Sequence, residues 1–198
     1  MIALGFCLDQ RKWLPGALSE GTQNECERVT AEVLRKRGMS AAQASDFVAK
    51  AWCDVTREYS FSDFKVFGDM TSLLRSLRRR GIKTAVCTMD SRTGTEQFLD
   101  SLGIRSEFDV IMCGDDPDST PKPAADNALT ICNRLQVDPS RVVIVGDTSA
   151  DMGMGRNAQL GLTVAVLSGV GEVHDLKDDA DYVINDVSEV LRILTPAG

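Results

Sequence analysis

The chain has 198 residues, a length that suits one globular domain or one domain with a small accessory lobe. Hydrophobic residues make up 43% and charged residues 26%, and 29 acidic against 22 basic side chains give a net charge of −7. This acidic balance argues against nucleic acid or an anionic membrane as a partner, because both require a basic surface. No apolar run approaches the roughly 18 residues of a membrane span. The first ten residues lack the features of a secretory signal, so we expect a cytoplasmic protein.

The six cysteines show no spacing typical of a metal or redox site. No Cys-x-x-Cys pair occurs, and several cysteines stand within apolar runs, where a free cysteine behaves as a small hydrophobic residue. We therefore interpret all of them as reduced thiols: Cys7, Cys26, Cys53, Cys87, Cys113 and Cys132.

The N-terminal third has apolar residues at helical spacing. This pattern predicts one helix over 24–37 and a second from 41 to about 59, with Gly38 as the stop of the first. From Gly68 onward, short apolar runs alternate with helical patterns instead. We therefore expect a helical segment over 1–66 and an α/β core over 67–198.

Within the core, continuous apolar strands that alternate with helices predict a parallel sheet covered on both faces. The helix after Lys122 is expected to begin with Pro123 at its first position. The expected strands cover 83–88, 109–113, 142–146, 162–167 and 182–184, and the expected helices cover 69–80, 93–102, 123–135, 150–160 and 187–194.

Chemistry in an open α/β sheet lies beyond the carboxyl ends of its strands. Thr88 ends the first expected strand, Lys122 follows the second between two prolines, and Asp147 and Asp151 follow the third. A hydroxyl and a lysine ammonium can bind a phosphate, and two carboxylates suit Mg²⁺. The sequence therefore predicts a phosphate site from Thr88 and Lys122 and a magnesium site from Asp147 and Asp151.

Other patterns have structural interpretations. Gly153 to Ala158 matches Gly-x-Gly-x-x-Ala, but it begins beyond the turn after its strand, so small residues there are expected to let a helix approach the sheet. The lone His174 is interpreted as an exposed bystander. We interpret Asp115, Asp116 and Asp118 as solvated loop acids that repel one another.

Together these motifs resemble those of the haloacid dehalogenase superfamily of phosphohydrolases. Thr88 resembles its second motif, Lys122 in Pro-Lys-Pro its third, and Gly146-Asp147-Thr148-x-x-Asp151 its fourth. Gly114-Asp115-Asp116 and the helical pair, as a cap, resemble the phosphoglycolate phosphatase-like branch. The resemblance implies a three-layer, Rossmann-like parallel sheet with a helical cap, Mg²⁺ as cofactor and a small phosphorylated metabolite as substrate.

The chain departs from this family at the first motif, Asp-x-Asp-x-Thr/Ser at the end of the first strand, which is absent. Its first aspartate is the family's nucleophile, and family order would place it upstream of Met1. That strand is also the central one, between those at 83–88 and 142–146. We therefore expect a sheet without its first strand, in a fragment, a shorter isoform or a gene model begun at an internal methionine.

Residues 1–6 look instead like the end of a cap helix. In the alternative, residues 2–8 fill the central position and bring Asp9 near the place of the nucleophile, although no second aspartate follows.

Two functions stay open on the sequence. The resemblance implies a Mg²⁺-dependent phosphomonoester hydrolase whose catalytic nucleophile is unassigned. The missing motif favours an inactive product that keeps a phosphate and Mg²⁺ pocket or has a protein-interaction role. A dehalogenase would not need the aspartate pair, and a phosphomutase would need the missing aspartates. A homodimer is an open alternative for the assembly.

Overall fold

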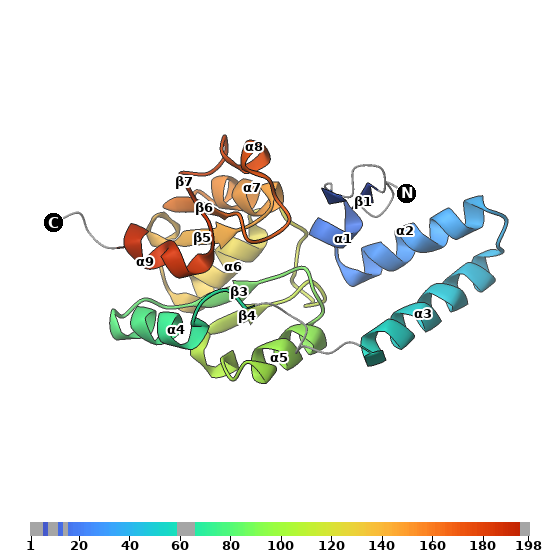
Figure 1. Cartoon of the computed structure of the whole chain (residues 1–198), viewed down its shortest axis with the longest axis horizontal. Coiled ribbons are helices and arrows are strands. Elements are labelled where there is room, and N and C mark those ends of the chain that lie inside the picture. Colours follow the sequence, from blue (N-terminus) through green and yellow to red (C-terminus); the bar gives the residue numbers. More distant parts are fainter. Residues whose placement is uncertain (1–5, 8–11, 14–15, 59–65, 195–198) are drawn as a thin grey trace. The chain divides into compact units, whose positions relative to one another are not determined.

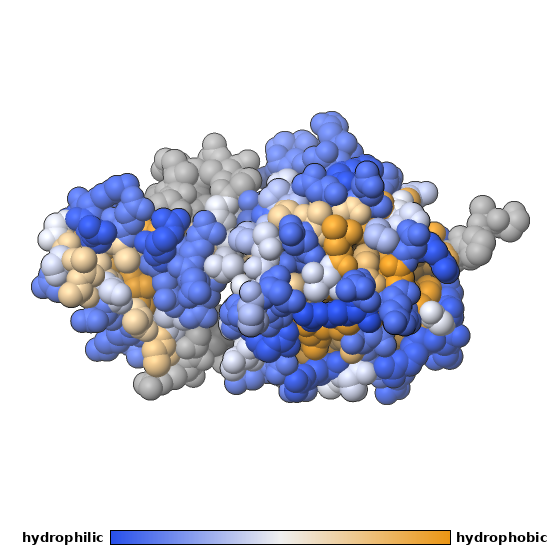
Figure 2. Space-filling view, turned by 180° about the vertical axis from the view of Figure 1, so that it is seen from behind, coloured by the Kyte–Doolittle hydropathy of each residue, from blue (hydrophilic) through white to orange (hydrophobic). Residues whose placement is uncertain are grey.

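The computed structural model describes residues 6–7, 12–13, 16–58 and 66–194. It divides into two units, Met1–Phe64 and Lys65–Gly198 (Figure 1). Within the described ranges, no helix is both long enough and apolar enough to cross a bilayer. The face of the molecule in Figure 2 is largely hydrophilic, with apolar side chains gathered in smaller areas between the polar ones.

The first unit is built on a pair of helices, α2 (Gln23–Lys36) and α3 (Ala41–Glu58), which pack against each other. Thr22 caps the start of α2 by accepting a hydrogen bond from the backbone N–H of Glu25. Gly38, with φ of 101°, ends this helix in a left-handed turn that favours glycine. Both helices were expected from the spacing of their apolar residues, and both are confirmed.

The N-terminal end of this unit differs from both expectations for it. Strand β1 (Phe6–Cys7) pairs antiparallel with β2 (Lys12–Trp13) in a separate two-stranded sheet, and a short helix, α1 (Ala17–Glu20), follows. Phe6 therefore does not end a cap helix, and Phe6 and Cys7 do not fill the central position of the core sheet. The pairing is local, and a short loop costs less chain entropy to close than a distant one. Asp9 lies outside the described residues.

The core unit contains five parallel strands, each within its predicted range. Strand β3 (Ala85–Cys87) pairs with β4 (Val110–Met112), and β5 (Val143–Gly146) pairs with β6 (Leu162–Val166), which pairs with β7 (Tyr182–Ile184). The strands thus form a two-stranded and a three-stranded sheet, and no described residue forms a strand between β3 and β5.

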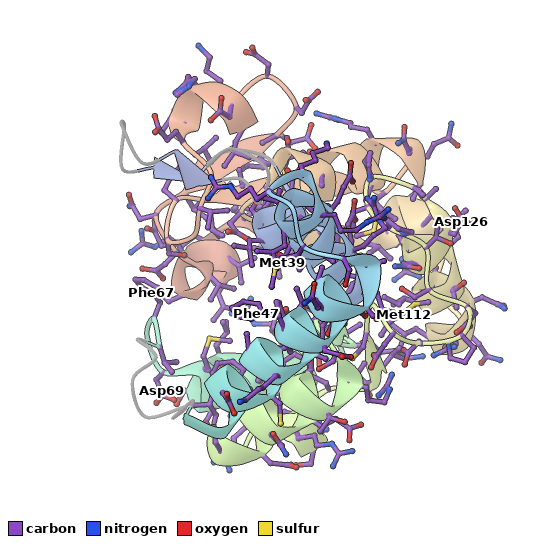
Figure 3. The ribbon with its side chains drawn as sticks, turned by 90° about the vertical axis from the view of Figure 1, so that its right-hand side faces the viewer. Met39, Phe47, Phe67, Asp69, Met112 and Asp126 are labelled. Atoms are coloured by element: carbon purple, nitrogen blue, oxygen red, sulfur yellow. The ribbon has the colours of Figure 1, made fainter. Side chains whose placement is uncertain are left out.

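Helices alternate with these strands, as predicted. They are α4 (Met70–Arg79), α5 (Arg92–Ser101), α6 (Asp126–Leu135), α7 (Ser149–Asn157), α8 (Val173–Leu176) and α9 (Val190–Ile193). Short 3-10 turns occur at Arg105–Glu107, Pro139–Arg141 and Val187–Glu189. Asp69 starts α4 by accepting hydrogen bonds from the backbone N–H and the hydroxyl of Ser72 (Figure 3).

Neighbouring residues of β5 show that helices cover both faces of the strand. Successive side chains in a strand point to opposite faces. Ile144 packs against the apolar cluster of α6 and α7, whereas Val145 packs against the cluster of α4 and α9. The core is therefore a three-layer α/β fold, in agreement with the sequence-based prediction.

The same clusters join the two sheets. Cys87 of β3 and Ile144 of β5 both pack on one cluster, formed by Ala128 of α6 with Met154 and Ala158 of α7. The hydrophobic layer thus continues beneath both sheets although their strands are not hydrogen-bonded to each other.

Helix α6 begins at Asp126, so the prediction that Pro123 opens it is wrong. The backbone N–H of Ala124 instead donates to the carbonyl of Pro121 at 3.2 Å and closes a turn. The carbonyl of Pro123 accepts a hydrogen bond from the Asn157 side chain of α7 at 2.8 Å, rather than one from within α6.

Candidate functional site

Lys122 links the carboxyl ends of β3 and β5. Its Nζ donates to a carboxylate oxygen of Asp151 at 2.7 Å and to the carbonyl of Cys87, the last residue of β3, at 2.9 Å. Asp151 lies in the first turn of α7, directly after β5. Two of the four predicted site residues are therefore in direct contact, although the sequence analysis assigned one to phosphate and the other to metal.

The Lys122–Asp151 pair is buried and charged. The Lys122 and Asp151 side chains are only 12% and 9% exposed. Burial alone would lower the pKa of Lys122, but the nearby Asp151 carboxylate, with a smaller effect from Asp147, outweighs it and raises this pKa. Burial also raises the pKa of the Cys87 thiol, which stays protonated. Lys122 is thus a fixed positive charge at this edge of the core.

Asp151 is held in place by the cap of its own helix. Its second carboxylate oxygen accepts hydrogen bonds from the backbone N–H of Thr148 at 3.1 Å and from the Thr148 hydroxyl at 2.7 Å. The same hydroxyl accepts from the backbone N–H of Asp151, which completes a capping box. The positive end of the helix dipole adds to this stabilisation of the carboxylate.

Asp147 is enclosed by the loop after β6. Its Oδ2 accepts a hydrogen bond from the backbone N–H of Val170 at 2.8 Å, and its carbonyl accepts one from Gly171 at 3.0 Å. A Cβ at Gly169 would lie 1.9 Å from Asp147 Oδ2, and one at Gly171 would lie 2.3 Å from the Asp147 carbonyl oxygen. Only glycine allows this close approach at both positions. The sequence analysis missed this loop, and the Gly-x-Gly pattern beside His174 was the available signal.

Thr88 follows β3, and its hydrogen bonds go to other residues than the remaining three predicted ones. Its hydroxyl donates to Asp90 Oδ2 at 3.0 Å and accepts from the Asp90 backbone N–H at 3.1 Å. Its own N–H donates to the carbonyl of Met112 in β4 at 3.0 Å and so fixes the strand end. A phosphate that binds Thr88 would have to replace Asp90 as acceptor of the hydroxyl proton.

The interpretation of Asp116 as a solvated acid is wrong. Arg92, the first residue of α5, donates from Nε and Nη2 to the two carboxylate oxygens of Asp116 at 2.7 and 2.6 Å. This hydrogen bonding lowers the pKa of Asp116, whose side chain is 11% exposed. Asp118 pairs with Arg134 at 2.8 Å, and Asp115 accepts from the Arg92 backbone N–H. The positive partners replace the mutual repulsion that was expected.

Asn127 supports the Lys122 loop from α6. Its side chain is fully buried, and its Oδ1 accepts from the backbone N–H of Thr120 while its Nδ2 donates to the Thr120 carbonyl, both at 2.8 Å. Both backbone groups two residues before Lys122 are thus held by one side chain. No motif in the sequence marks this asparagine.

The letters Asp-x-Asp-x-Thr occur once, at Asp116-Pro117-Asp118-Ser119-Thr120. This stretch follows β4 rather than a first strand, and both carboxylates already pair with arginines. We therefore assign the buried Asp116 to the support of the loop, interpret Asp118 as part of an exposed ion pair, and assign neither to nucleophilic attack.

The acidic residues of the site fit Mg²⁺ by their chemistry. Mg²⁺ keeps several waters and takes one or two protein carboxylates together with substrate phosphate oxygens. Asp147 has Oδ1 without a hydrogen-bond partner among the described residues, and Asp151 keeps acceptor capacity on Oδ1, the oxygen that Lys122 contacts, because its other oxygen already accepts two hydrogen bonds from Thr148. The described part of the chain holds no group of three or more His, Cys, Asp or Glu side chains that could bind a metal.

Two structural interpretations of the sequence are confirmed. A Cβ at Gly155 would lie 2.5 Å from Thr163 Cγ2 and 2.7 Å from Ile144 Cγ2, so the small residue lets α7 approach the sheet. His174 is exposed and lies between two acids, Glu172 and Asp175. The described cysteines outside any disulfide bond are Cys26, Cys53, Cys87, Cys113 and Cys132.

Comparison with known proteins agrees with this geometry. The chain is 24% identical over 182 residues to a phosphoglycolate phosphatase of Cupriavidus necator, covering 92% of this chain and 77% of that protein. It is 29% identical over 121 residues to the pyrophosphatase PpaX of Halalkalibacterium halodurans, covering 61% of this chain and 56% of that protein.

The same fold occurs in a solved structure, a "predicted phosphoglycolate phosphatase" from Haemophilus somnus. Its TM-score is 0.76 at 16% identity, over 90% of this chain and 79% of that one. Among the curated relatives, the chain spans as little as 51% of one and as much as 77% of another. The family model for haloacid dehalogenase-like hydrolases matches residues 15–166. The chain therefore belongs to the haloacid dehalogenase-like hydrolase family.

Proposed function

We propose that this chain provides the phosphate and Mg²⁺ site of a phosphatase that acts on a small phosphomonoester. The observation that carries the proposal is the buried Lys122–Asp151 pair, which fixes a protonated ammonium at the strand ends. A lysine ammonium is a common ligand of phosphate, and low exposure strengthens its attraction for an anion. The names of the two curated relatives, a phosphoglycolate phosphatase and a pyrophosphatase, support a small phosphorylated molecule as substrate, and the first of them supports a phosphomonoester.

Each residue has a role in this proposal. Lys122 and Thr88 bind the phosphoryl oxygens, while Asp151 keeps the ammonium in position through its 2.7 Å contact. Asp147 and Asp151 hold the cation, with Asp147 offering Oδ1. When bound, Mg²⁺ offsets the charge that develops on the phosphoryl group. The helical segment over 1–66 acts as a cap that excludes water and selects the substrate.

A specific observation favours a second candidate, a binding pocket without hydrolysis. Among the described residues, Asp151 is the only aspartate that forms an ion pair with Lys122, and β3 and β5 are not paired with each other. Without a nucleophile, the chain would bind phosphate and Mg²⁺ but would not turn a substrate over.

The test is Mg²⁺-dependent hydrolysis of p-nitrophenyl phosphate by the 198-residue chain, beside Asp147→Asn and the matched surface control Asp118→Asn. Asp118 is exposed and, within the part of the chain that the structure describes, pairs only with Arg134, so its substitution should leave turnover unchanged. Turnover that disappears in Asp147→Asn supports the phosphatase, and Asp9→Asn then asks whether Asp9 is the nucleophile.

Absence of turnover with saturable binding of inorganic phosphate and Mg²⁺ would support the second candidate. A folded chain that binds neither would refute both functions.

A further inference from the structure

The loop Ser168–Glu172, which follows β6, leaves Asp147 with one carboxylate oxygen for a ligand. Oδ2 is the acceptor of the 2.8 Å hydrogen bond from Val170, whereas Oδ1 has no hydrogen-bond partner among the described residues. The backbone of Asp147 is fixed as well, because its carbonyl accepts from Gly171. Asp147 therefore cannot turn to present both oxygens without losing a contact.

Asp151 is restrained in the same way by different partners. One of its oxygens contacts Lys122 Nζ and the other contacts the backbone N–H and hydroxyl of Thr148. A cation at this site would meet two carboxylates that each present a single oxygen. Ca²⁺ takes six to eight oxygens and often a bidentate carboxylate, whereas Mg²⁺ takes six ligands in an octahedron and retains waters.

We propose that the loop Gly169–Gly171 is a positioning element that makes the site select Mg²⁺ over Ca²⁺ by holding Asp147 to single-oxygen coordination. This inference rests on the proposed role of Asp147 as a metal ligand. The glycines are required for this positioning, because a Cβ at Gly169 would lie 1.9 Å from Asp147 Oδ2 and would displace the carboxylate. Gly171 also packs closely against the core, since a Cβ at this position would lie 2.7 Å from Cδ1 of the fully buried Leu176.

The first experiment measures Mg²⁺ and Ca²⁺ binding by calorimetry for the wild type, Gly169→Ala and Val170→Pro. Val170→Pro removes the backbone N–H that donates to Asp147 Oδ2, a hydrogen bond that we call the clamp. Because the Val170 side chain is exposed, this change breaks the clamp without opening the core. The matched control is Val173→Pro. Val173 is exposed at the first position of α8, where proline is tolerated, and its N–H has no hydrogen-bond partner among the described residues.

We expect the ratio of the Ca²⁺ to the Mg²⁺ dissociation constant to fall about tenfold in both clamp variants, the lower end of the effect of losing a hydrogen bond to a metal ligand. The ratio should stay within about threefold of wild type in Val173→Pro. Thermal unfolding checks that each variant is folded.

The second experiment follows hydrogen exchange at the Val170 amide by NMR and requires only the wild type and Asp147→Ala. The amide should be protected in the metal-free wild type, stay protected at saturating Mg²⁺, and exchange faster in Asp147→Ala. Protection lost on Mg²⁺ saturation would show that Asp147 binds through both oxygens and would overturn the inference, even if neither clamp variant folds.

The two proposals fail in different ways. A wild type that binds no Mg²⁺ overturns the metal site itself, and the selectivity inference with it. Mg²⁺ binding with an unchanged Ca²⁺/Mg²⁺ ratio in both clamp variants overturns the inference alone and leaves the metal site standing.

Discussion

Removal of either partner of the Lys122–Asp151 pair should lower the free energy of unfolding strongly. Removal of both partners should lower it by less than the sum of the two single losses. At 2.7 Å the attraction of the two charges is about 6 kcal/mol for an effective dielectric constant of 20, and desolvation offsets much of it. Removal of one partner of a buried pair costs about 3 kcal/mol at the lower end of the usual range. We use the lower end because the survivors keep other contacts, Asp151 with Thr148 and Lys122 with the Cys87 carbonyl.

The assay is a double-mutant cycle by urea denaturation at pH 7 with Lys122→Met, Asp151→Asn and the combined variant. We expect about 3 kcal/mol lost in each single variant and about 4 kcal/mol in the double variant, a coupling of about 2 kcal/mol. Single losses that add to within about 0.5 kcal/mol would refute the reasoning, because independent residues behave in that way.

Three further predictions concern the supports of the site and the core. Arg92→Gln should lower the free energy of unfolding by about 1.5 kcal/mol at pH 7, since Arg92 is more than one-third exposed. Because Arg92 lowers the pKa of Asp116 in the folded chain below 3.8, the ordinary value for an aspartate, the contribution of this pair to stability is complete above pH 3.8. It is lost as the pH falls through the lower pKa of the folded state. An equal loss of unfolding free energy at pH 7 and pH 2, measured by urea denaturation, would contradict this. Asn127→Ala should cost about 2 kcal/mol, because it strips two backbone partners from Thr120, and an unchanged midpoint would count against that support. Met152→Ala should cost about 3 kcal/mol from a fully buried site, and a loss below about 1 kcal/mol would mean that the core refills the cavity.

The fold could be predicted where the pattern is long enough to repeat. The α2 and α3 helices and all five core strands follow from apolar spacing, because such segments bury one face or both faces regularly. The short α8 helix has only four residues, which is too few for a helical period to show. Pro123 matched a helix start by residue type, yet the turn closed by Ala124 and the contact from Asn157 decide the backbone there.

The site was predicted as a set of strand ends, but its contacts were not. Parallel strands bring their carboxyl ends to one edge, so the residues after β3 and β5 were expected to gather there. Which side chains then bond depends on rotamers and on distant loops. Thr88 bonds to Asp90, two residues further along the chain, in a local turn that its residue type permits but does not require. That Val170 reaches Asp147, 23 residues away, follows from tertiary structure alone. The break between β3 and β5 matches the expectation of a sheet without its central strand, which came from the missing first motif and not from any pattern within the two strands themselves.

The hydrogen bond from Lys122 to the Cys87 carbonyl bears on the tendency of the protein to aggregate. The Thr84 carbonyl accepts a hydrogen bond from Asp109, and the Thr88 N–H donates one to Met112, so both groups point toward β4. Alternate residues of a parallel strand bond to opposite neighbours, and the Cys87 carbonyl therefore faces the edge of β3 away from β4. An unpaired strand edge templates aggregation, and a lysine placed against it is one way in which proteins prevent this. We therefore expect Lys122 to hinder the pairing of this strand edge with a strand of another molecule. Light scattering should show Lys122→Met forming larger particles than Asp151→Asn, which retains the ammonium, at equal concentration and equal folded fraction.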